Sequence, residues 1–295
     1  MIAAGIDLGG TKIEAQVFDS GWNRIESRRI ATPKSYPDLV AAVAQQIVWI
    51  DAQSPDLPIG IAAAGLINAR GIALTANLPA TGQPFPADIA RAAGRKITYI
   101  NDCRAQALSE ARFGAARGYR TAISLNLGTG LAGGVVTNGH LLPGPTGLGG
   151  EFGHFALPAH IIAAHDLPLI RCGCGRMACT ETLIAGPGLS RIHAHLTGQH
   201  ATPEAITTGD HAATMKVWLD LTAEMIHTLI MIIDPDCIVL AGGLSRAPNL
   251  IPRLTQALQA AQLPGYSTPL LRLAEGGDTT GARGAAFAAL QAVTA

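Results

Sequence analysis

Short apolar runs separated by glycine turns open the chain. Residues 2–8 are rich in isoleucine, alanine and leucine, and Gly9-Gly10-Thr11 separates them from a second apolar run over 13–18. This pattern predicts a strand, a tight turn and an antiparallel strand. Further apolar runs over 59–63 and 97–100 predict two buried strands.

Helical spacing of apolar residues appears between and after these runs. Leucine, valine and isoleucine recur at helical intervals over 39–50, directly after Asp38, which we expect to cap this helix. A long helical pattern covers 215–234, and an alanine-rich helix is predicted over 281–293. The alternation of strands and helices is typical of an α/β fold.

The opening pattern begins again near the middle of the chain. Residues 121–127 and 131–137 are predicted strands, and Gly128-Thr129-Gly130 forms the turn between them. The two hairpins therefore look like copies of one unit, one in each of two lobes. A buried strand over 237–241 then leads into a third glycine pair, Gly242-Gly243.

Composition and charge exclude several classes of protein. With 295 residues, 48% of them hydrophobic and 14% charged, the chain can build two compact domains. Lys plus Arg and Asp plus Glu number 21 each, so no net field attracts the chain to nucleic acid or to a membrane surface. We find neither a signal-peptide pattern nor an apolar run of membrane-spanning length, which predicts a cytoplasmic location.

The glycine turns are candidate phosphate-binding loops, because phosphate oxygens need converging N–H donors that glycine leaves accessible. In the first loop Asp7 is placed to face a magnesium ion or its water, and Thr11 and Lys12 to reach phosphate. The second loop includes Thr129, and each loop taken alone could equally be a plain hairpin turn. Two such loops in matched context, together with the glycine pair Gly242-Gly243 after a buried strand, favour a nucleotide site. Its candidate residues are Asp7, Gly9, Gly10, Thr11, Lys12, Gly128, Thr129, Gly130, Gly133, Gly242 and Gly243.

Three of the five cysteines lie together at Cys172, Cys174 and Cys179, whereas Cys103 and Cys237 stand alone in apolar surroundings. In a cytosolic chain this spacing indicates a zinc site rather than disulfides. A histidine would complete a tetrahedral set of four protein ligands, which is typical of structural zinc. His154, His160 and His165 are the candidates.

Asp102 is the candidate catalytic base for phosphoryl transfer to a hydroxyl group. It follows a predicted buried strand and precedes a helical run, at the strand end where α/β sites gather. The pair Asn101-Asp102 could equally cap that helix. We expect Glu110, Glu204 and Glu224 to be surface charges away from any site.

Several of these segments resemble the ROK sugar kinases, a family of the actin-like ATPase superfamily. The resemblance lies in residues 5–12, 128–135, 150–154 and 172–181, and it extends along the whole chain. It is closest to bacterial N-acetylglucosamine kinases, through residues 76–80, 150–157, 233–236 and 241–245. One departure is Ala178, where the family commonly has glycine; it should perturb a turn and leave the zinc ligands in place.

The resemblance implies a two-lobed actin-like (ribonuclease H-like) fold with a central cleft between the lobes. We expect an N-terminal lobe over 1–115, on which a helix over 281–295 packs, and a C-terminal lobe over 116–280. The implied activity is transfer of phosphate from magnesium ATP to the 6-hydroxyl of N-acetylglucosamine, with a homodimer as the family's expected assembly. Glucose and N-acetylmannosamine are the rival substrates.

The resemblance also assigns roles to particular residues. It makes Asp102 the base and His154 the fourth zinc ligand, so zinc would be structural. Sugar contacts would come from Asn77, Asn101, Asp102, Glu151, His154 and Glu181, although Glu181 could equally face solvent on a helix. A non-catalytic sugar-sensing regulator is the alternative class; it would need a DNA-binding domain before the first loop, for which Gly5 leaves no room.

Overall fold

The computed structural model of the chain describes residues 1–277 and 280–294. Internal packing divides it into two compact units. Unit 1 contains Met1–Arg117, Gly134–Gly149 and the C-terminal segment from Glu275, and unit 2 contains Gly118–Gly133 and Gly150–Ala274. The sequence placed one boundary after residue 115 and assigned residues 134–149 to the second lobe, so the structure differs on that segment.

The segment joins unit 1 through apolar packing and hydrogen bonds. Val136 packs against Ala107 and Leu108 of helix α3 (Asp102–Phe113). Arg104 of the same helix donates to the carbonyl oxygens of Leu142 and Gly147, at 3.4 and 3.5 Å. These are contacts between distant parts of the chain, which hydrophobic periodicity does not reveal.

Unit 1 is built on a five-stranded sheet of order β3-β2-β1-β4-β7. Its strands are β1 (Ala3–Leu8), β2 (Lys12–Phe18), β3 (Arg24–Ala31), β4 (Ile59–Ala63) and β7 (Thr98–Asn101). The predicted hairpin is confirmed: β1 and β2 are antiparallel, whereas β4 runs parallel to both β1 and β7. The edge strand β3 was not predicted, because its mostly exposed, charged residues give no apolar pattern.

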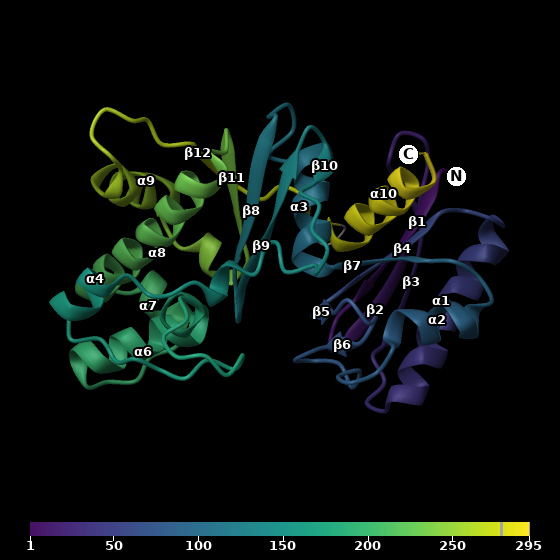
Figure 1. Cartoon of the computed structure of the whole chain (residues 1–295), viewed down its shortest axis with the longest axis horizontal. Coiled ribbons are helices and arrows are strands. Elements are labelled where there is room, and N and C mark those ends of the chain that lie inside the picture. Colours follow the sequence, from purple (N-terminus) through teal and green to yellow (C-terminus); the bar gives the residue numbers. More distant parts are fainter. Residues whose placement is uncertain (278–279, 295) are drawn as a thin grey trace. The chain divides into compact units, whose positions relative to one another are not determined.

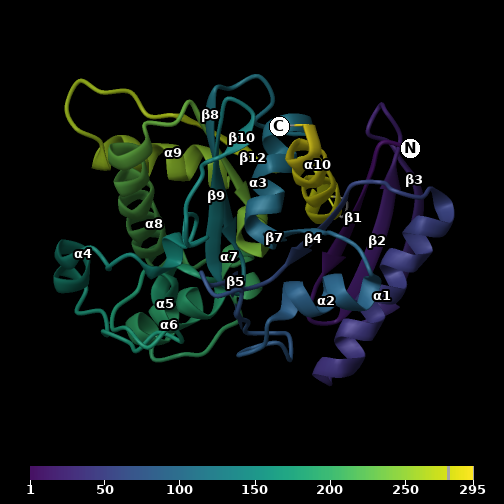
Figure 2. The same ribbon diagram turned by 45° about the vertical axis from the view of Figure 1, so that its right-hand side comes forward.

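Helices cover both faces of this sheet (Figures 1 and 2). Helices α1 (Tyr36–Gln53) and α2 (Phe85–Ala93) share a core with Ile6 and Leu8 of β1. The residues of β1 that alternate with these face α10 (Thr280–Thr294), whose backbone comes so close that a Cβ on Gly5 would overlap the carbonyl oxygen of Ala282. The predicted C-terminal helix therefore packs on unit 1, and residue 295 lies outside the described residues.

The cap of α1 is a correction to the sequence-based prediction. Ser35, not Asp38, is the N-cap: its Oγ accepts the N–H of Asp38 at 3.3 Å and lies 2.6 Å from the Asp38 carboxylate. Asp38 therefore stands inside the first helical turn, where a negative charge is favourable. Both residues are good caps, so spacing alone could not separate them.

The second sheet has the order β10-β9-β8-β11-β12. Its strands are β8 (Thr121–Leu127), β9 (Leu131–Thr137), β10 (His140–Leu141), β11 (Cys237–Ala241) and β12 (Leu270–Leu273), and the boundary between the units falls inside β9. Like the first sheet, it begins with a chain-adjacent pair and continues into parallel strands, since β11 pairs parallel to both β8 and β12. The predicted strands 121–127, 131–137 and 237–241 are confirmed.

Helices make up most of the rest of unit 2, coloured from teal to yellow-green in Figure 1. They are α4 (Ala159–Ala164), α5 (Glu181–Ile184), α6 (Gly186–Thr197), α7 (Pro203–Thr208), α8 (Ala212–Ile233) and α9 (Leu250–Ala261). The long predicted helix is α8, and its fully buried Trp218 donates to the carbonyl oxygen of Ile184 at 2.8 Å. Within the described residues, no helix combines the length and apolarity needed to cross a membrane.

Candidate active site

The first glycine loop (Gly9–Lys12) joins β1 to β2. The N–H of Gly9 donates to the carbonyl oxygen of Lys12 at 3.0 Å, which closes a tight turn. On Gly10, a Cβ would lie 3.0 Å from the Cβ of Asn77, so a branched residue would not fit there. Asn77, a predicted sugar contact, therefore packs directly against the loop in unit 1.

Charged side chains line the face of the sheet beside this loop. Asp7 and Glu14 occupy paired positions on β1 and β2. Glu14 is buried and accepts two hydrogen bonds from Arg29, at 2.7 and 3.0 Å. The ammonium group of Lys12 lies 3.5 Å from the same carboxylate. Lys12, expected to reach phosphate, is thus already partly neutralised.

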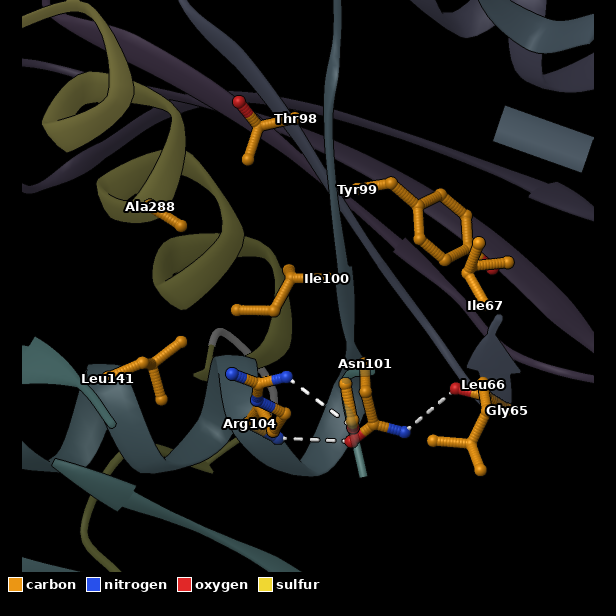
Figure 3. A pocket seen from close by; sticks show the side chains of 11 residues that line it. Gly65, Leu66, Ile67, Thr98, Tyr99, Ile100, Asn101, Arg104, Leu141 and Ala288 are labelled. Atoms are coloured by element: carbon orange, nitrogen blue, oxygen red, sulfur yellow. Dashed lines mark hydrogen bonds between the residues drawn. The ribbon is translucent and has the colours of Figure 1, made fainter. Parts of the chain in front are cut away.

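Asn101 and Asp102 lie where β7 ends and α3 begins. The side-chain oxygen of Asn101 accepts the N–H of Arg104 at 3.2 Å, and its amide nitrogen donates to the carbonyl oxygen of Gly65 at 3.1 Å (Figure 3). Asn101 is therefore the N-cap of α3, and the capping interpretation holds for this residue. Asp102 is the first helical residue, and its carboxylate accepts the N–H of Cys103 at 2.9 Å.

Burial raises the pKa of the Asp102 carboxyl above its ordinary value, although the N–H of Cys103 opposes the shift. Removing a carboxylate from water destabilises its charged form, so the group holds a proton more readily. A carboxylate in this state is a stronger proton acceptor than an exposed one. Because Asn101 supplies the cap of α3, the capping interpretation and the prediction that Asp102 is a proton acceptor are compatible.

A pocket of about 330 Å³ opens beside Asn101 (Figure 3). Both sides of β7 contribute to it, with Tyr99 and Ile100 pointing in opposite directions from the strand. The hydroxyl group of Tyr99 is buried and has no hydrogen-bond partner within the described residues. The other lining residues are Gly65, Leu66, Ile67, Thr98, Arg104, Leu141, Gly147 and Ala288.

The second glycine loop (Gly128–Gly130) joins β8 to β9 in unit 2. The N–H of Gly128 donates to the carbonyl oxygen of Gly130 at 3.1 Å, and the N–H of Gly186 donates to that of Gly128 at 2.8 Å. One oxygen of Glu181 accepts the N–H of Leu131 at 3.0 Å, at the end of the loop. Glu181 thus faces the loop rather than solvent.

Glycine is favoured at positions 133 and 242 for two different structural reasons. A Cβ on Gly133 would overlap the carbonyl oxygen of Ser124 and the ring of Phe152, so tight packing requires glycine there. Gly242 has a φ of 84°, a left-handed conformation that favours glycine, and begins the short 3-10 helix η2 (Gly243–Arg246). The third glycine pair therefore joins β11 to a helical turn.

The second loop and η2 line one cavity of about 700 Å³ in unit 2. Two other segments of its wall, Gly186-Pro187 and 202–208, were not predicted from the sequence. Both contain a proline at the start of a helix, a signal that was available. Glu204 is exposed, as expected of a surface charge, and it also lines this cavity. The full lining is Gly128, Thr129, Gly186, Pro187, Thr202, Pro203, Glu204, Thr207, Thr208, Gly243, Leu244, Arg246 and Ala247.

The structure brings His154 together with the three clustered cysteines. Nδ1 of His154 lies 3.6 Å from the sulfur of Cys172, and the sulfurs of Cys174 and Cys179 are 3.7 Å apart. One ligand atom from each of the four residues lies within 4.8 Å of the others. His160 instead lies 3.3 Å from the Glu224 carboxylate, and the backbone oxygen of His165 faces His195 at 3.2 Å.

The three thiols have different surroundings, which shift their pKa values in different directions. Burial raises the pKa of Cys172 and raises that of Cys179 to about 12, whereas the backbone N–H of Arg176 lowers the pKa of Cys174. A bound cation would displace the protons of the first two thiols, since thiolates are the metal ligands. The other ring nitrogen of His154, Nε2, lies 3.6 Å from the carboxylate of Glu151.

The turn before Cys179 carries a backbone strain. Ala178 has a φ of 58°, in the left-handed region that alanine rarely adopts. Two hydrogen bonds hold it there: its N–H donates to Ile170 at 2.9 Å, and its carbonyl oxygen accepts from Leu157 at 3.0 Å. This is the position where the sequence resemblance led us to expect a perturbed turn.

Glu110 corrects another expectation, because it is buried rather than a surface charge. Its carboxylate accepts the backbone N–H groups of Ala115, Glu275 and Gly276, at 2.9, 3.1 and 2.7 Å. These donors lie at two places where the chain passes between the units. A buried carboxylate that accepts several backbone N–H groups leaves no signature in a single sequence.

The fold and the paired glycine hairpins define the class of protein: the chain has the actin-like ATPase fold. A solved structure of a ROK hexokinase from Thermus thermophilus matches it with a TM-score of 0.86 and 31% identity, covering 100% of this chain and 99% of that one. The predicted fold class is confirmed.

The ROK family model matches residues 3–292, and the chain belongs to this family. It is 38% identical over 292 residues to an N-acetylgalactosamine kinase of Shewanella sp. (strain ANA-3), covering 96% of this chain and 95% of that protein. It is 37% identical over 295 residues to an N-acetyl-D-glucosamine kinase of Pectobacterium atrosepticum, covering 96% and 97%. The family resemblance stated from the motifs is thereby confirmed.

Proposed function

We propose that the protein is an ATP-dependent kinase that phosphorylates the 6-hydroxyl of N-acetyl-D-glucosamine. Family membership and the names of the two relatives support a kinase acting on an N-acetylated aminosugar. The observation that carries the proposal is Asp102, a partly buried carboxylate with a raised pKa directly after the capping residue Asn101. Such a group suits proton acceptance from a sugar hydroxyl.

In the proposed reaction Asp102 accepts the proton of the 6-hydroxyl while the sugar oxygen attacks the γ-phosphorus of ATP. A new phosphorus–oxygen bond forms, the bond to the β-phosphate oxygen breaks, and ADP leaves with the electron pair. Asn101 would fix the acceptor through its side chain, which Gly65 and Arg104 already hold in place. Catalysis then rests on positioning and proton removal.

We infer that the two glycine loops bind the phosphates of ATP and that the 700 Å³ cavity of unit 2 takes the nucleoside. Its volume suits a nucleoside, and Thr129 and Gly243 contribute to its wall. Asp7, at the end of β1, would hold a magnesium ion through its carboxylate. Magnesium neutralises charge on the phosphates when bound.

For the sugar hydroxyls and the acetamide we propose contacts from Asn77 and Asn101 in unit 1, and from Glu151, His154 and Glu181 in unit 2. A polyol enters a pocket only when its polar groups find partners, so carboxylates and amides are the expected lining. The 3.6 Å separation of Glu151 and His154 supports a joint role for these two.

We further propose that His154, Cys172, Cys174 and Cys179 hold a structural zinc. Three thiolates and one imidazole match the donor preference of zinc, and the four ligand atoms lie close enough to surround one ion. With four protein ligands no position is left for water, so zinc would organise the loop rather than act on substrate. Fixing Nδ1 of His154 would orient Nε2 toward the sugar.

N-acetylgalactosamine is the second candidate substrate, because one relative at 38% identity acts on that sugar by its name. The two sugars differ only in the orientation of one hydroxyl, which a polar pocket can distinguish. Glucose and N-acetylmannosamine remain the rivals predicted from sequence, and a sugar-sensing regulator without activity remains the alternative from another class.

The test is a comparison of catalytic efficiency on the four sugars, with ADP release and sugar phosphate both quantified. We expect N-acetylglucosamine to give the highest kcat/KM. If kcat/KM were tenfold higher for glucose, the protein would still be a kinase, but an aminosugar would not be its substrate. Sugar binding without any phosphate transfer would instead support the regulator.

A further inference from the structure

A short segment between β3 and α1 is fastened to the first glycine loop. The N–H of Thr32 donates to the carbonyl oxygen of Thr11 at 3.1 Å, and its hydroxyl donates to that of Gly9 at 2.7 Å. The ammonium group of Lys34 donates to the carbonyl oxygen of Gly10 at 3.3 Å. Three successive carbonyl groups of the loop are therefore bound by one segment.

The backbone N–H groups of this loop differ from its carbonyl groups. Within the part of the chain that the structure describes, the N–H groups of Gly10 and Thr11 have no hydrogen-bond partner. In a planar trans peptide the N–H points away from the carbonyl group of the same unit. Since the carbonyls of Gly9 and Gly10 face Thr32 and Lys34, the amides of Gly10 and Thr11 face the opposite side.

The segment itself is anchored at both ends. Thr32 is buried, and Pro33 fixes one backbone angle. Ser35 caps α1 directly afterwards. A segment held in this way can impose a conformation on the loop rather than follow it.

Lys34 also differs from the other lysine at this loop in its charge balance. Lys12 shares the buried carboxylate of Glu14 with Arg29. Lys34 has no carboxylate within ion-pair distance among the described residues. Its positive charge at the loop is therefore uncompensated and favours an anion nearby.

We propose that Thr32 and Lys34 are positioning residues for ATP: they hold the carbonyls of the first glycine loop so that its amides are presented to phosphate. This inference rests on the proposed kinase function but concerns a pair of residues outside the glycine motif. Phosphate binding by backbone N–H groups depends on their convergence, which the two side chains fix in advance.

The test is equilibrium binding of ATP and of adenosine to wild type, Lys34→Gln and Thr32→Val, followed by steady-state kinetics. We expect ATP affinity to fall about tenfold in Lys34→Gln, as for loss of a charge-assisted hydrogen bond, and less in Thr32→Val. Adenosine affinity and the KM for the sugar should stay within about twofold, because neither contacts the loop amides.

Lys34→Arg should restore most of the ATP affinity, because it keeps the charge and a donor. Lys96→Gln is the matched control, an exposed lysine of unit 1 just before β7, and should bind ATP like wild type. The inference is overturned if Lys34→Gln binds ATP as wild type does, or if it loses ATP, adenosine and sugar binding together. If the wild type binds ATP but phosphorylates no sugar, the proposed function is contradicted, whereas the role of Thr32 and Lys34 can still be tested by ATP binding. If the wild type binds no ATP, both the proposed function and this inference are overturned.

Discussion

Replacing Ala178 by glycine should stabilise the protein, because the residue is held in a left-handed conformation. An L-residue with a Cβ pays about 1–2 kcal/mol in that region. Glycine avoids this conformational cost, but its greater freedom in the unfolded state lowers the free energy of unfolding by about 0.5–1 kcal/mol. The midpoints of these two ranges differ by a net gain of about 0.75 kcal/mol. Both backbone hydrogen bonds of Ala178 are kept in the variant.

For a chain of this size that gain corresponds to a rise of roughly 1–3 °C in the midpoint of thermal unfolding. Urea unfolding followed by circular dichroism would give the same quantity at constant temperature. The cysteines are untouched, so metal content should not change.

Ala41→Gly is the control, because Ala41 is exposed in the interior of α1 with ordinary helical geometry. It should lower stability by about 1 kcal/mol. If Ala178→Gly lowered stability to the same extent, the turn before Cys179 would carry no strain and the reasoning would be refuted.

Three further predictions concern the base, the metal and a buried carboxylate. Asp102→Asn should lower kcat by about two to four orders of magnitude while sugar affinity is largely kept. In wild type kcat/KM should decline as pH falls through the raised pKa of Asp102, because the protonated carboxyl cannot accept a proton. Elemental analysis should find about one zinc per chain, lost in Cys174→Ser, with sugar binding reduced more than ATP binding. Glu110→Gln should reduce the free energy of unfolding by about 1–3 kcal/mol, measured in urea, because buried N–H groups lose their acceptor.

Each of these has an outcome that contradicts it. Wild-type turnover in Asp102→Asn would show that Asp102 is not the catalytic base. The same conclusion would follow if kcat/KM declined at low pH with the pKa of an exposed aspartate. Zinc that stays bound in Cys174→Ser, or full activity without zinc, would defeat the metal assignment. An unchanged urea midpoint in Glu110→Gln would mean that the carboxylate does not hold the segments it contacts.

The sequence predicted the parts of the fold that bury an apolar pattern. The strands at 59–63, 121–127, 131–137 and 237–241 are fully or largely buried, and all four were found. Strand β3 escaped because an exposed edge strand needs no apolar residues. The cap of α1 was misplaced because both Ser35 and Asp38 satisfy the same local rule.

Some residues of the candidate site could likewise be predicted from the sequence, and others could not. His154 could be joined to the cysteine cluster only through the family resemblance, since spacing left His160 and His165 equally open. Glu110 and the wall of the cavity around Gly186 depend on contacts between residues distant in sequence. The prolines that begin α6 and α7 could have indicated two helix starts. Neither they nor a glutamate such as Glu110 show from a single sequence which distant residues they contact.

The packing of α10 against β1 has a consequence for how the protein is made. The backbone of α10 closely approaches Gly5 and Gly60, yet this helix follows all of unit 2 in the sequence and leaves the ribosome after it. Until α10 is synthesised, one face of the sheet of unit 1 lacks its covering helix, and covering it requires contact between segments far apart in the sequence. Such long-range closure is slow compared with local folding. We therefore expect nascent chains that stop before Thr280 to aggregate or recruit chaperones, even though they already contain both glycine loops and the cysteine cluster.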